Sequence, residues 1–402
     1  MSTPTTATGE FDKRTGLAFI VAFGIVSLFA DMAYEGMRAV SGPFLATLGA
    51  SGAAVGVIAG TGELFGYLLR LGSGKLAERT RLYWPIALAG YVIQMAAVPA
   101  LALAGNWMSA AVFIILERTG KAVRNPAANT MMSRAGEHIG QGWAFGLHEA
   151  LDQTGALAGP LIASLVLAHH GRYAAAFEWL GIPAALTVLS VVIVCIRFPH
   201  AGHIPQPKAA QSGQAALTRA FWLYAGSAAL TAFGFVDYPL IAYHFTKAHV
   251  MSAALVPVLY AVAMGASGAG SLVFGRWYDA RGLIVLVPGL MITAVAAPLA
   301  FLGSFDVALL GALFWGLALG IHDAIMNAAV ATMVPAHARA RAYGFFTAIY
   351  GIAWFLGSGL LGLLYDRSLL LVAGVSVIAQ LLALIPLFAA MRASVAPGRI
   401  FR

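Results

Sequence analysis

The segment GKLAERTR at residues 74–81 returns in altered form as GRWYDARG at residues 275–282, and 275 − 74 gives a spacing of 201 positions. Both copies begin with glycine, carry an acid four residues later (Glu78 and Asp279) and keep arginines close to that acid. Each copy also separates two long apolar runs. A repeat of this length between apolar runs is typical of membrane proteins built from two duplicated halves.

The composition favours a membrane protein over a soluble one. The chain of 402 residues is 60% hydrophobic and only 10% charged, whereas a soluble domain has about 25% charged residues. Backbone groups in hydrocarbon must be satisfied within the segment, and a spanning helix needs roughly 20 apolar residues. We therefore predict an all-α membrane protein with twelve transmembrane helices, at about 16–38, 53–73, 83–104, 107–132, 142–168, 175–196, 218–245, 252–275, 283–303, 307–333, 341–364 and 368–391.

The positive charges predict the orientation. With the N-terminus in the cytoplasm, 16 Lys and Arg residues fall in cytoplasmic segments and 3 on the opposite side. This bias predicts that both termini are cytoplasmic and explains the net charge of +8 without nucleic acid. The Pro- and Gln-containing segment 200–217 reads as a cytoplasmic linker. We expect a monomer in the inner membrane, with six-helix bundles at 1–199 and 218–402.

The two copies of the repeat resemble the loop signature of the major facilitator superfamily, which usually reads Gly-x-Leu-Ala-Asp-Arg-x-Gly-Arg. The first copy departs from it by Glu78 and by lacking the second glycine, while the second keeps Asp279 and Gly282. Residues 155–160 (GALAGP) are similar to the family's Gly-Pro signature in its fifth helix. Four further segments look like a poorly characterised branch of that family: 31–43, 117–129, 148–160 and 354–366.

The resemblance implies a transporter whose first, fourth, seventh and tenth helices line a central cavity. It also implies a latch on the cytoplasmic side. The residues expected to form this cytoplasmic latch are Gly74, Glu78, Arg79, Arg124, Gly275, Asp279 and Arg281. The alternative is a plain charged loop that obeys the positive-inside rule.

Ionisable residues inside the predicted spans are the main functional signal. A charge in the middle of a span costs about 2.5–3.5 kcal/mol on insertion scales, so such residues should face a cavity or a partner. Six of the eight acids and all five bases lie in the N-terminal half. The candidates for substrate binding or proton coupling are Asp31, Tyr34, Glu35, Glu63, Glu117, Arg118, His148, Glu149, Asp152, Asp237, His322, Asp323 and Asn327.

Helical spacing groups these candidates on shared faces. Asp31 and Glu35 are four residues apart, so two carboxylates share one face, and protonation of one would relieve their repulsion. Arg38 extends that stripe and would snorkel to the outer interface. A buried Arg118 needs an anionic partner, for which the sequence offers Asp152 or Glu149. The alternative to a functional role is a static ion pair that fixes two helices together.

The C-terminal half offers fewer polar residues. Asp237 precedes Pro239, which can break a helix and free backbone carbonyls. His322 and Asp323 could carry a proton, since histidine titrates near neutral pH. Glu63 lies in a glycine-rich span of the N-terminal half and could line a cavity or form a structural pair.

These observations predict a secondary transporter that moves a small solute by alternating access, coupled to protons, with a slight preference for export of a small organic compound. Import or exchange of an organic anion stays open, as does metal transport, since His322 and Met326 are four residues apart and methionine suits copper(I). A lipid-moving or receptor-like role on the same scaffold is the alternative of another class. We expect no enzymatic activity and no cofactor, and the expected partners are the substrate, protons and the lipid bilayer.

Overall fold

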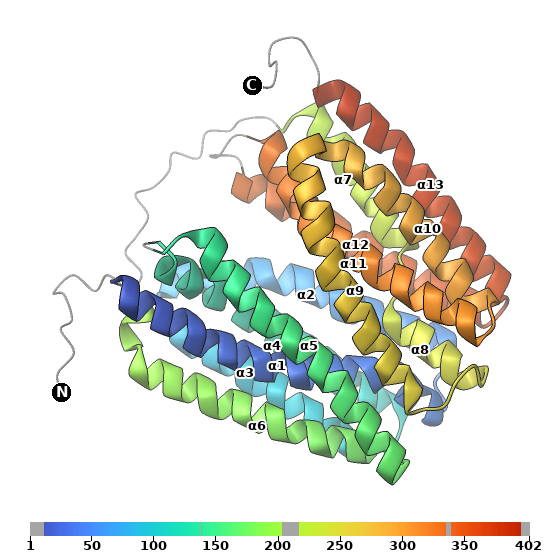
Figure 1. Cartoon of the computed structure of the whole chain (residues 1–402), viewed down its shortest axis with the longest axis horizontal. Coiled ribbons are helices and arrows are strands. Elements are labelled where there is room, and N and C mark those ends of the chain that lie inside the picture. The colour runs from blue at the N-terminus through green and yellow to red at the C-terminus, as the bar shows by residue number, and fades with distance from the viewer. Residues whose placement is uncertain (1–11, 138, 203–216, 335–338, 395–402) are drawn as a thin grey trace. The chain divides into compact units, whose positions relative to one another are not determined.

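The computed structural model describes residues 12–137, 139–202, 217–334 and 339–394, and the regular structure within these ranges is helical throughout (Figure 1). Most of the expected linker, residues 203–216, lies outside the described residues. The helices are α1 (Lys13–Thr47), α2 (Gly52–Thr80), α3 (Tyr83–Ala100), η1 (Leu101–Leu103), α4 (Trp107–Ala135), α5 (Gln141–His170), α6 (Tyr173–Arg197), η2 (Pro199–Gly202), α7 (Arg219–Gly234), α8 (Tyr238–Lys247), α9 (Leu255–Arg281), η3 (Gly282–Val285), α10 (Leu286–Leu302), α11 (Phe305–Met333), α12 (Arg339–Tyr365) and α13 (Leu369–Ser394).

Ten stretches of the described residues are long and apolar enough to cross a membrane. One of them, Leu255–Leu302, is 48 residues long and contains both α9 and α10. Helix α4 has 29 residues but is not among the ten, because Glu117, Arg118, Lys121 and Arg124 lie close together in it. The charged residues that make α4 a functional candidate are therefore also what separates it from an ordinary apolar span.

The chain forms two compact units. The first comprises Met1–Met37 with Leu68–Pro207, and the second comprises Arg38–Tyr67 with Lys208–Arg402. The second unit thus includes the end of α1 and the first half of α2, although both precede most of the first unit in the sequence.

Glycines bring the helices of the first unit close together. A Cβ atom at Gly155 or Gly159 of α5 would collide with the backbone carbonyls of Leu28 or Met32 in α1. A Cβ at Gly120 of α4 would collide with the α3 backbone. Small residues at helix crossings are how membrane helices gain close packing, since lipid gives no hydrophobic drive for association. These contacts set the spacing of α1 against α5 and of α3 against α4, and α1, α4 and α5 carry candidate polar residues.

In the second unit, α7 and α8 form one interrupted helix. The backbone leaves the helix at Phe235–Asp237 and resumes at Tyr238, with Pro239 in the first turn of α8. The break predicted from Pro239 is therefore confirmed, and it lies just before the proline because proline is favourable at the start of a helix. The Nε1 of Trp315 in α11 donates to the freed carbonyl of Val236 over 2.7 Å.

The repeated signature is helical, which corrects its description as a loop. Helix α2 continues to Thr80 and α9 to Arg281, so both copies form the last turns of a helix. Each copy ends at a residue with positive φ, Arg81 (57°) and Gly282 (65°), and these positions are again 201 residues apart. The second glycine of the signature thus marks a backbone turn, which the first copy makes with arginine.

Candidate functional site

A polar cavity lies in the first unit between α1, α4 and α5. Its volume is about 110 Å³, and its polar lining comes from Ser27, Asp31, Lys121, Arg124, Asn125, Asn129, His148 and Asp152. We call this cavity, together with these lining residues, the polar cavity. The sequence singled out Asp31 on α1 and both His148 and Asp152 on α5, and the structure brings these three residues together around one cavity.

The α5 side of the polar cavity carries a histidine–aspartate pair. Nε2 of His148 lies 3.7 Å from Oδ2 of Asp152, one helical turn away, and 3.4 Å from the hydroxyl of Ser27 in α1. Among the described residues, Nδ1 of His148 and Oδ1 of Asp152 are buried without a hydrogen-bond partner. Buried polar atoms without partners are rare, and they mark places where water, a proton or a ligand can bind.

The α4 side supplies the positive charges. The ammonium of Lys121 lies 3.6 Å from the ring centre of Tyr34, and Arg118 stands over the same ring at 5.1 Å. The charges of Asp31 and Glu35 also act on Lys121. A tyrosine face beside a cation provides attraction without neutralising the charge. Lys121 thus lies against the tyrosine ring and within the electrostatic influence of two carboxylates of α1.

Arg124 is held by a buried chain of hydrogen bonds from α3. Its Nε donates to Oε1 of Gln94 over 2.6 Å, and its Nη1 donates to the hydroxyl of Tyr91 over 3.0 Å. Nε2 of Gln94 then donates to Oε1 of Glu117 over 2.7 Å. Gln94 and Glu117 have no exposed surface, and Arg124 is 5% exposed. We therefore assign Arg124 to the polar cavity, whereas the sequence favoured a place in the cytoplasmic latch.

Arg118 has a carboxylate next to it in the chain. Its Nε lies 3.9 Å from Oε2 of Glu117, which belongs to the same helix. The sequence pointed to Asp152 or Glu149 on α5 as partners, but the structure pairs Asp152 with His148 and bonds Glu149 to Gln153.

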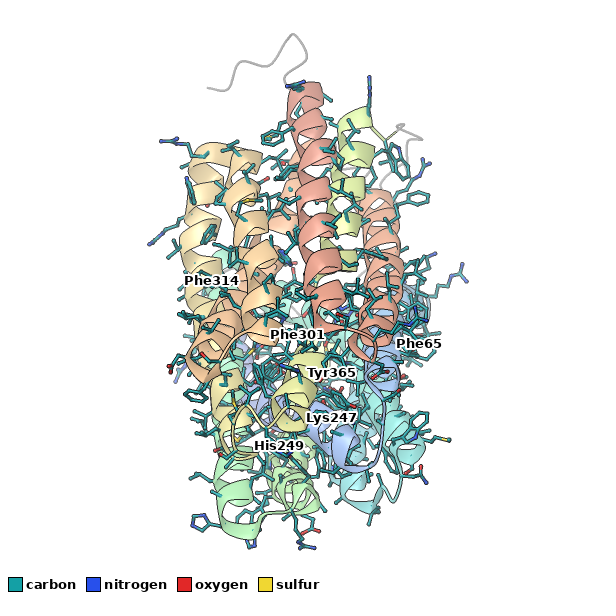
Figure 2. The ribbon with its side chains drawn as sticks, turned by 90° about the vertical axis from the view of Figure 1, so that its right-hand side faces the viewer. Phe65, Lys247, His249, Phe301, Phe314 and Tyr365 are labelled. Atoms are coloured by element: carbon teal, nitrogen blue, oxygen red, sulfur yellow. The ribbon has the colours of Figure 1, made fainter. Side chains whose placement is uncertain are left out.

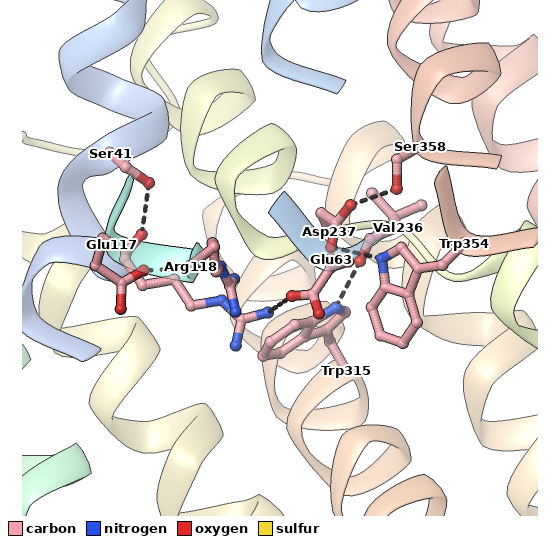
Figure 3. Close-up of polar contacts among 10 residues, drawn as sticks. Ser41, Glu63, Glu117, Arg118, Val236, Asp237, Trp315, Trp354 and Ser358 are labelled. Carbon is pink, nitrogen blue, oxygen red and sulfur yellow. Dashed lines mark hydrogen bonds and ion pairs between the residues drawn. The ribbon is translucent and has the colours of Figure 1, made fainter. Parts of the chain in front are cut away.

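A second polar group surrounds the helix break of the second unit. Asp237 is buried and accepts a hydrogen bond from Nε1 of Trp354 (2.9 Å) and another from the hydroxyl of Ser358, both in α12 (Figure 3). Phe235 packs against Trp354 with ring centres 5.3 Å apart. Neutral donors thus satisfy the carboxylate at the break.

Arg38 and Glu63 form an ion pair in the second unit, with Nη2 and Oε1 3.7 Å apart. Arg38 is 8% exposed, so the expectation that it snorkels to the outer interface is wrong. A paired arginine inside a bundle is the usual arrangement for an intramembrane charge.

The remaining candidates are placed as follows. Glu35 is buried and Asp323 is exposed. His322 is buried, with Nε2 3.3 Å from the hydroxyl of Thr293 and its ring 5.1 Å from that of Phe235. Asn327 belongs to α11, but its side chain lies outside the described part of the structure.

The residues expected in the cytoplasmic latch are mostly exposed. This holds for Glu78, Arg79, Asp279 and Arg281, and no ion pair joins them among the described residues. A Cβ at Gly74 would be 3.5 Å from Pro126 of α4, whereas one at Gly275 would meet nothing within 4 Å. The cytoplasmic latch therefore stays a prediction.

The sequence reasoning missed several residues that complete both groups. These are Ser27, Tyr91, Gln94, Asn125, Asn129, Trp354 and Ser358. Gln94 carried a usable signal, because an amide within an apolar span must find a partner. Asn125 and Asn129 in α4 carried the same signal, whereas the hydroxyl and indole groups of the other residues did not. Within the residues that the structure describes, no three His, Cys, Asp or Glu side chains are placed to hold a metal ion.

The arrangement of helices and buried charges is that of a membrane transporter, and the comparison with known families agrees. The Major Facilitator Superfamily profile matches residues 16–358 and 226–398. The chain belongs to the major facilitator superfamily.

Relatives and solved structures support the family and the fold. An uncharacterized protein of Mycobacterium tuberculosis (strain H37Rv) is 39% identical over 388 residues, which cover 94% of each chain. An uncharacterized transporter of the same family from Methanocaldococcus jannaschii is 24% identical over 37% of each chain. A bacterial homologue of the human lysosomal transporter Spinster, inward-facing and unoccupied, superposes with a TM-score of 0.75 at 15% identity and covers 97% of this chain and 98% of its own. The nucleoside transporter NupG gives 0.70 at 15% identity, covering 94% and 99%.

Proposed function

We propose that this protein is a proton-coupled secondary transporter that moves a small organic solute by alternating access, with the polar cavity as its coupling site. The proposal includes twelve membrane crossings, with both termini in the cytoplasm, and a position in the inner membrane. It also keeps the halves at 1–199 and 218–402, joined by a linker at 200–217. The excess of Lys and Arg in the segments assigned to the cytoplasm supports the orientation.

One observation carries the proposal: two carboxylates, two cations and a histidine line one cavity between helices of an apolar protein. Here Nδ1 of His148 and Oδ1 of Asp152 have no hydrogen-bond partner among the described residues, while Nε2 and Oδ2 of the same two side chains lie 3.7 Å apart. Such a group can take up and release a proton with little movement of the helices.

The charge balance of the polar cavity links proton and solute. Asp31 and Asp152 contribute −2 when ionised, Lys121 and Arg124 contribute +2, and neutral His148 adds nothing, so the sum is zero. Binding of one proton leaves an uncompensated positive charge, which is costly away from water. A proton should therefore compete with a cationic solute and assist an anionic one.

This balance separates the two leading forms of the proposal. Competition between a proton and the solute gives antiport, so an inward proton gradient would drive export of a cationic organic compound. If a bound proton instead strengthens binding of the solute, the result is symport of an organic anion. The two cations on α4, Lys121 and Arg124, favour this second form. The pH dependence of solute binding distinguishes them, because acidification weakens binding in the first case and strengthens it in the second.

Transport in proteoliposomes tests the proposal. We would impose a pH gradient, offer a panel of organic cations and anions, and compare the wild type with Asp31→Asn and Asp152→Asn. Both variants should lose acceleration by the gradient while still exchanging solute across the membrane. Glu178→Gln is the matched control, since Glu178 is an exposed acid on α6 of the same unit. Gradient-driven transport that survives in both Asp variants would refute the coupling role.

A further inference from the structure

The first turn of α2 is capped by a carboxylate from a distant part of the chain. Oδ1 of Asp366 accepts a hydrogen bond from the backbone N–H of Gly52 over 2.8 Å, and Oδ2 accepts one from Ala53 over 2.9 Å. Asp366 directly follows α12 and is more than 300 residues away from this turn. The first N–H groups of a helix have no partner within the helix, and the helix dipole attracts a negative charge there.

Close packing of α2 against α12 continues below this cap. A Cβ at Gly56 would collide with the backbone oxygen of Ser358, and one at Gly60 would approach the oxygen of Phe355 to 3.0 Å. A Cβ at Gly362 would lie 2.5 Å from the oxygen of Gly52. The two backbones therefore touch over successive turns, which is possible only because these positions are glycine.

The end of α8 closes around the same point. The hydroxyl of Tyr243 donates to the carbonyl of Ala50 over 2.9 Å, and Nδ1 of His244 lies 3.1 Å from the hydroxyl of Tyr365. Tyr365 and Phe301 lie together beside the C-terminal end of α8 (Figure 2), with ring centres 6.0 Å apart. The turn between α1 and α2 is thus bound to α8 and to the end of α12.

We propose that Asp366, with the Gly52 and Ala53 amides and the glycine contacts beneath them, is a releasable latch that holds α2 against α12 and must open when the transporter opens to the outer side. We call it the Asp366 latch. The proposal rests on alternating access and on the orientation proposed above, in which the turns after α1 and α12 lie outside.

The chemistry of the Asp366 latch suits repeated opening. Asp366 is exposed, so water can replace both hydrogen bonds when α2 moves away. The carboxylate provides two directional hydrogen bonds and a negative charge, while the glycines allow the two helix backbones to pack more closely than any side chain would permit. A contact of this kind stabilises the closed end by a small amount and leaves no buried charge when it breaks.

Distance measurements between spin labels test the latch. The single native cysteine is replaced (Cys195→Ser), and labels are attached at the exposed positions Thr47 in α1 and Leu370 in α13. Pulsed electron–electron double resonance in nanodiscs then gives the share of molecules in which the two labels are at a short or at a long distance. Asp366→Ala should raise the share of the long distance about fivefold. Asp366→Asn, which keeps one acceptor, should give a smaller change.

Two matched controls separate the latch from a general loss of packing. Gly56→Ala should abolish the short distance, whereas Gly66→Ala on the same helix should leave it intact, because a Cβ at Gly66 meets nothing within 4 Å. Asp306→Asn removes an exposed acid from the first turn of α11, within its own helix, and should also change nothing. Size-exclusion profiles confirm that each variant is folded.

The outcomes are distinguishable. A long-distance population that grows in Gly56→Ala but not in Asp366→Ala overturns the Asp366 latch and leaves alternating access intact. A single short distance in every variant, at both acidic and neutral pH, overturns both. Equal shifts in Asp366→Ala and Asp306→Asn show a general charge effect and also overturn the latch.

Discussion

Gln94 should be the residue on which the α3–α4 packing of the first unit depends most. It bridges two charged groups of α4, accepting from Arg124 over 2.6 Å and donating to Glu117 over 2.7 Å, without any exposed surface. The informative change is Gln94→Met, which keeps the length of the side chain and removes both hydrogen bonds. A glutamate at this position would add a charge and confuse the result.

The expected loss follows from two interhelical hydrogen bonds inside a membrane. Such bonds contribute on average about 0.6 kcal/mol and at most about 1.7 kcal/mol, because an unfolded chain in the membrane also finds partners. Both bonds here involve a charged partner, which places them in the upper part of that range. We expect Gln94→Met to lower the free energy of unfolding by about 2–3 kcal/mol.

Unfolding in mixed detergent micelles with increasing dodecyl sulfate measures this free energy. A cycle with Glu117→Gln shows whether the loss passes through the Gln94–Glu117 bond, since coupled residues are not additive. Gln153→Met is a suitable control, because Gln153 bonds Glu149 in an exposed pair one turn away on α5. Unfolding of Gln94→Met within about 0.5 kcal/mol of the wild type would refute the bridging role.

Three further predictions concern packing and backbone conformation. Gly159→Ala should destabilise the protein by about 1–3 kcal/mol in the same assay, because the new methyl group collides with Met32, while Gly146→Ala on α5 should be tolerated. Gly282→Ala should cost about 1–3 kcal/mol, since φ 65° with ψ −148° is essentially restricted to glycine, and Arg81→Ala at the corresponding position should cost far less. Trp315→Phe removes the hydrogen bond to Val236 at the α7–α8 break and should cost about 0.5–1.5 kcal/mol, detectable as increased hydrogen exchange of residues 235–238.

Much of the helical architecture could be predicted from the sequence because hydrocarbon leaves few choices. The length of each apolar run predicts where a helix lies, and Pro239 predicted the interruption between α7 and α8. The ends of the helices were less predictable. The signature segments 74–81 and 275–282 are polar, which suggested loops, yet they continue α2 and α9, because charged side chains at a helix end can reach water while the backbone stays helical.

The sequence could predict contacts between residues one turn apart on the same helix. It could not predict contacts that depend on a residue of another helix. His148 and Asp152 lie one turn apart on α5, and the structure finds them paired. The position of Arg124 depends on Gln94 of α3, about 30 residues earlier, so no pattern within α4 could reveal it. Similarly, Asp237 depends on donors from α12, which are more than 100 residues away in sequence.

The distribution of buried charge changes when it is counted by compact unit instead of by sequence half. The second unit contains three of the eight acids, Glu63, Asp237 and Asp323, and one of the five bases, Arg38. The first unit therefore contains 8 − 3 = 5 acids and 5 − 1 = 4 bases. The acids of the two units also have different surroundings. Asp237 is fixed by neutral donors that would resist its exchange, whereas Asp152 faces a cavity shared with two cations. In the proposed proton-coupled cycle a coupling group must change partners, and this requirement favours the polar cavity over the helix break as the coupling site.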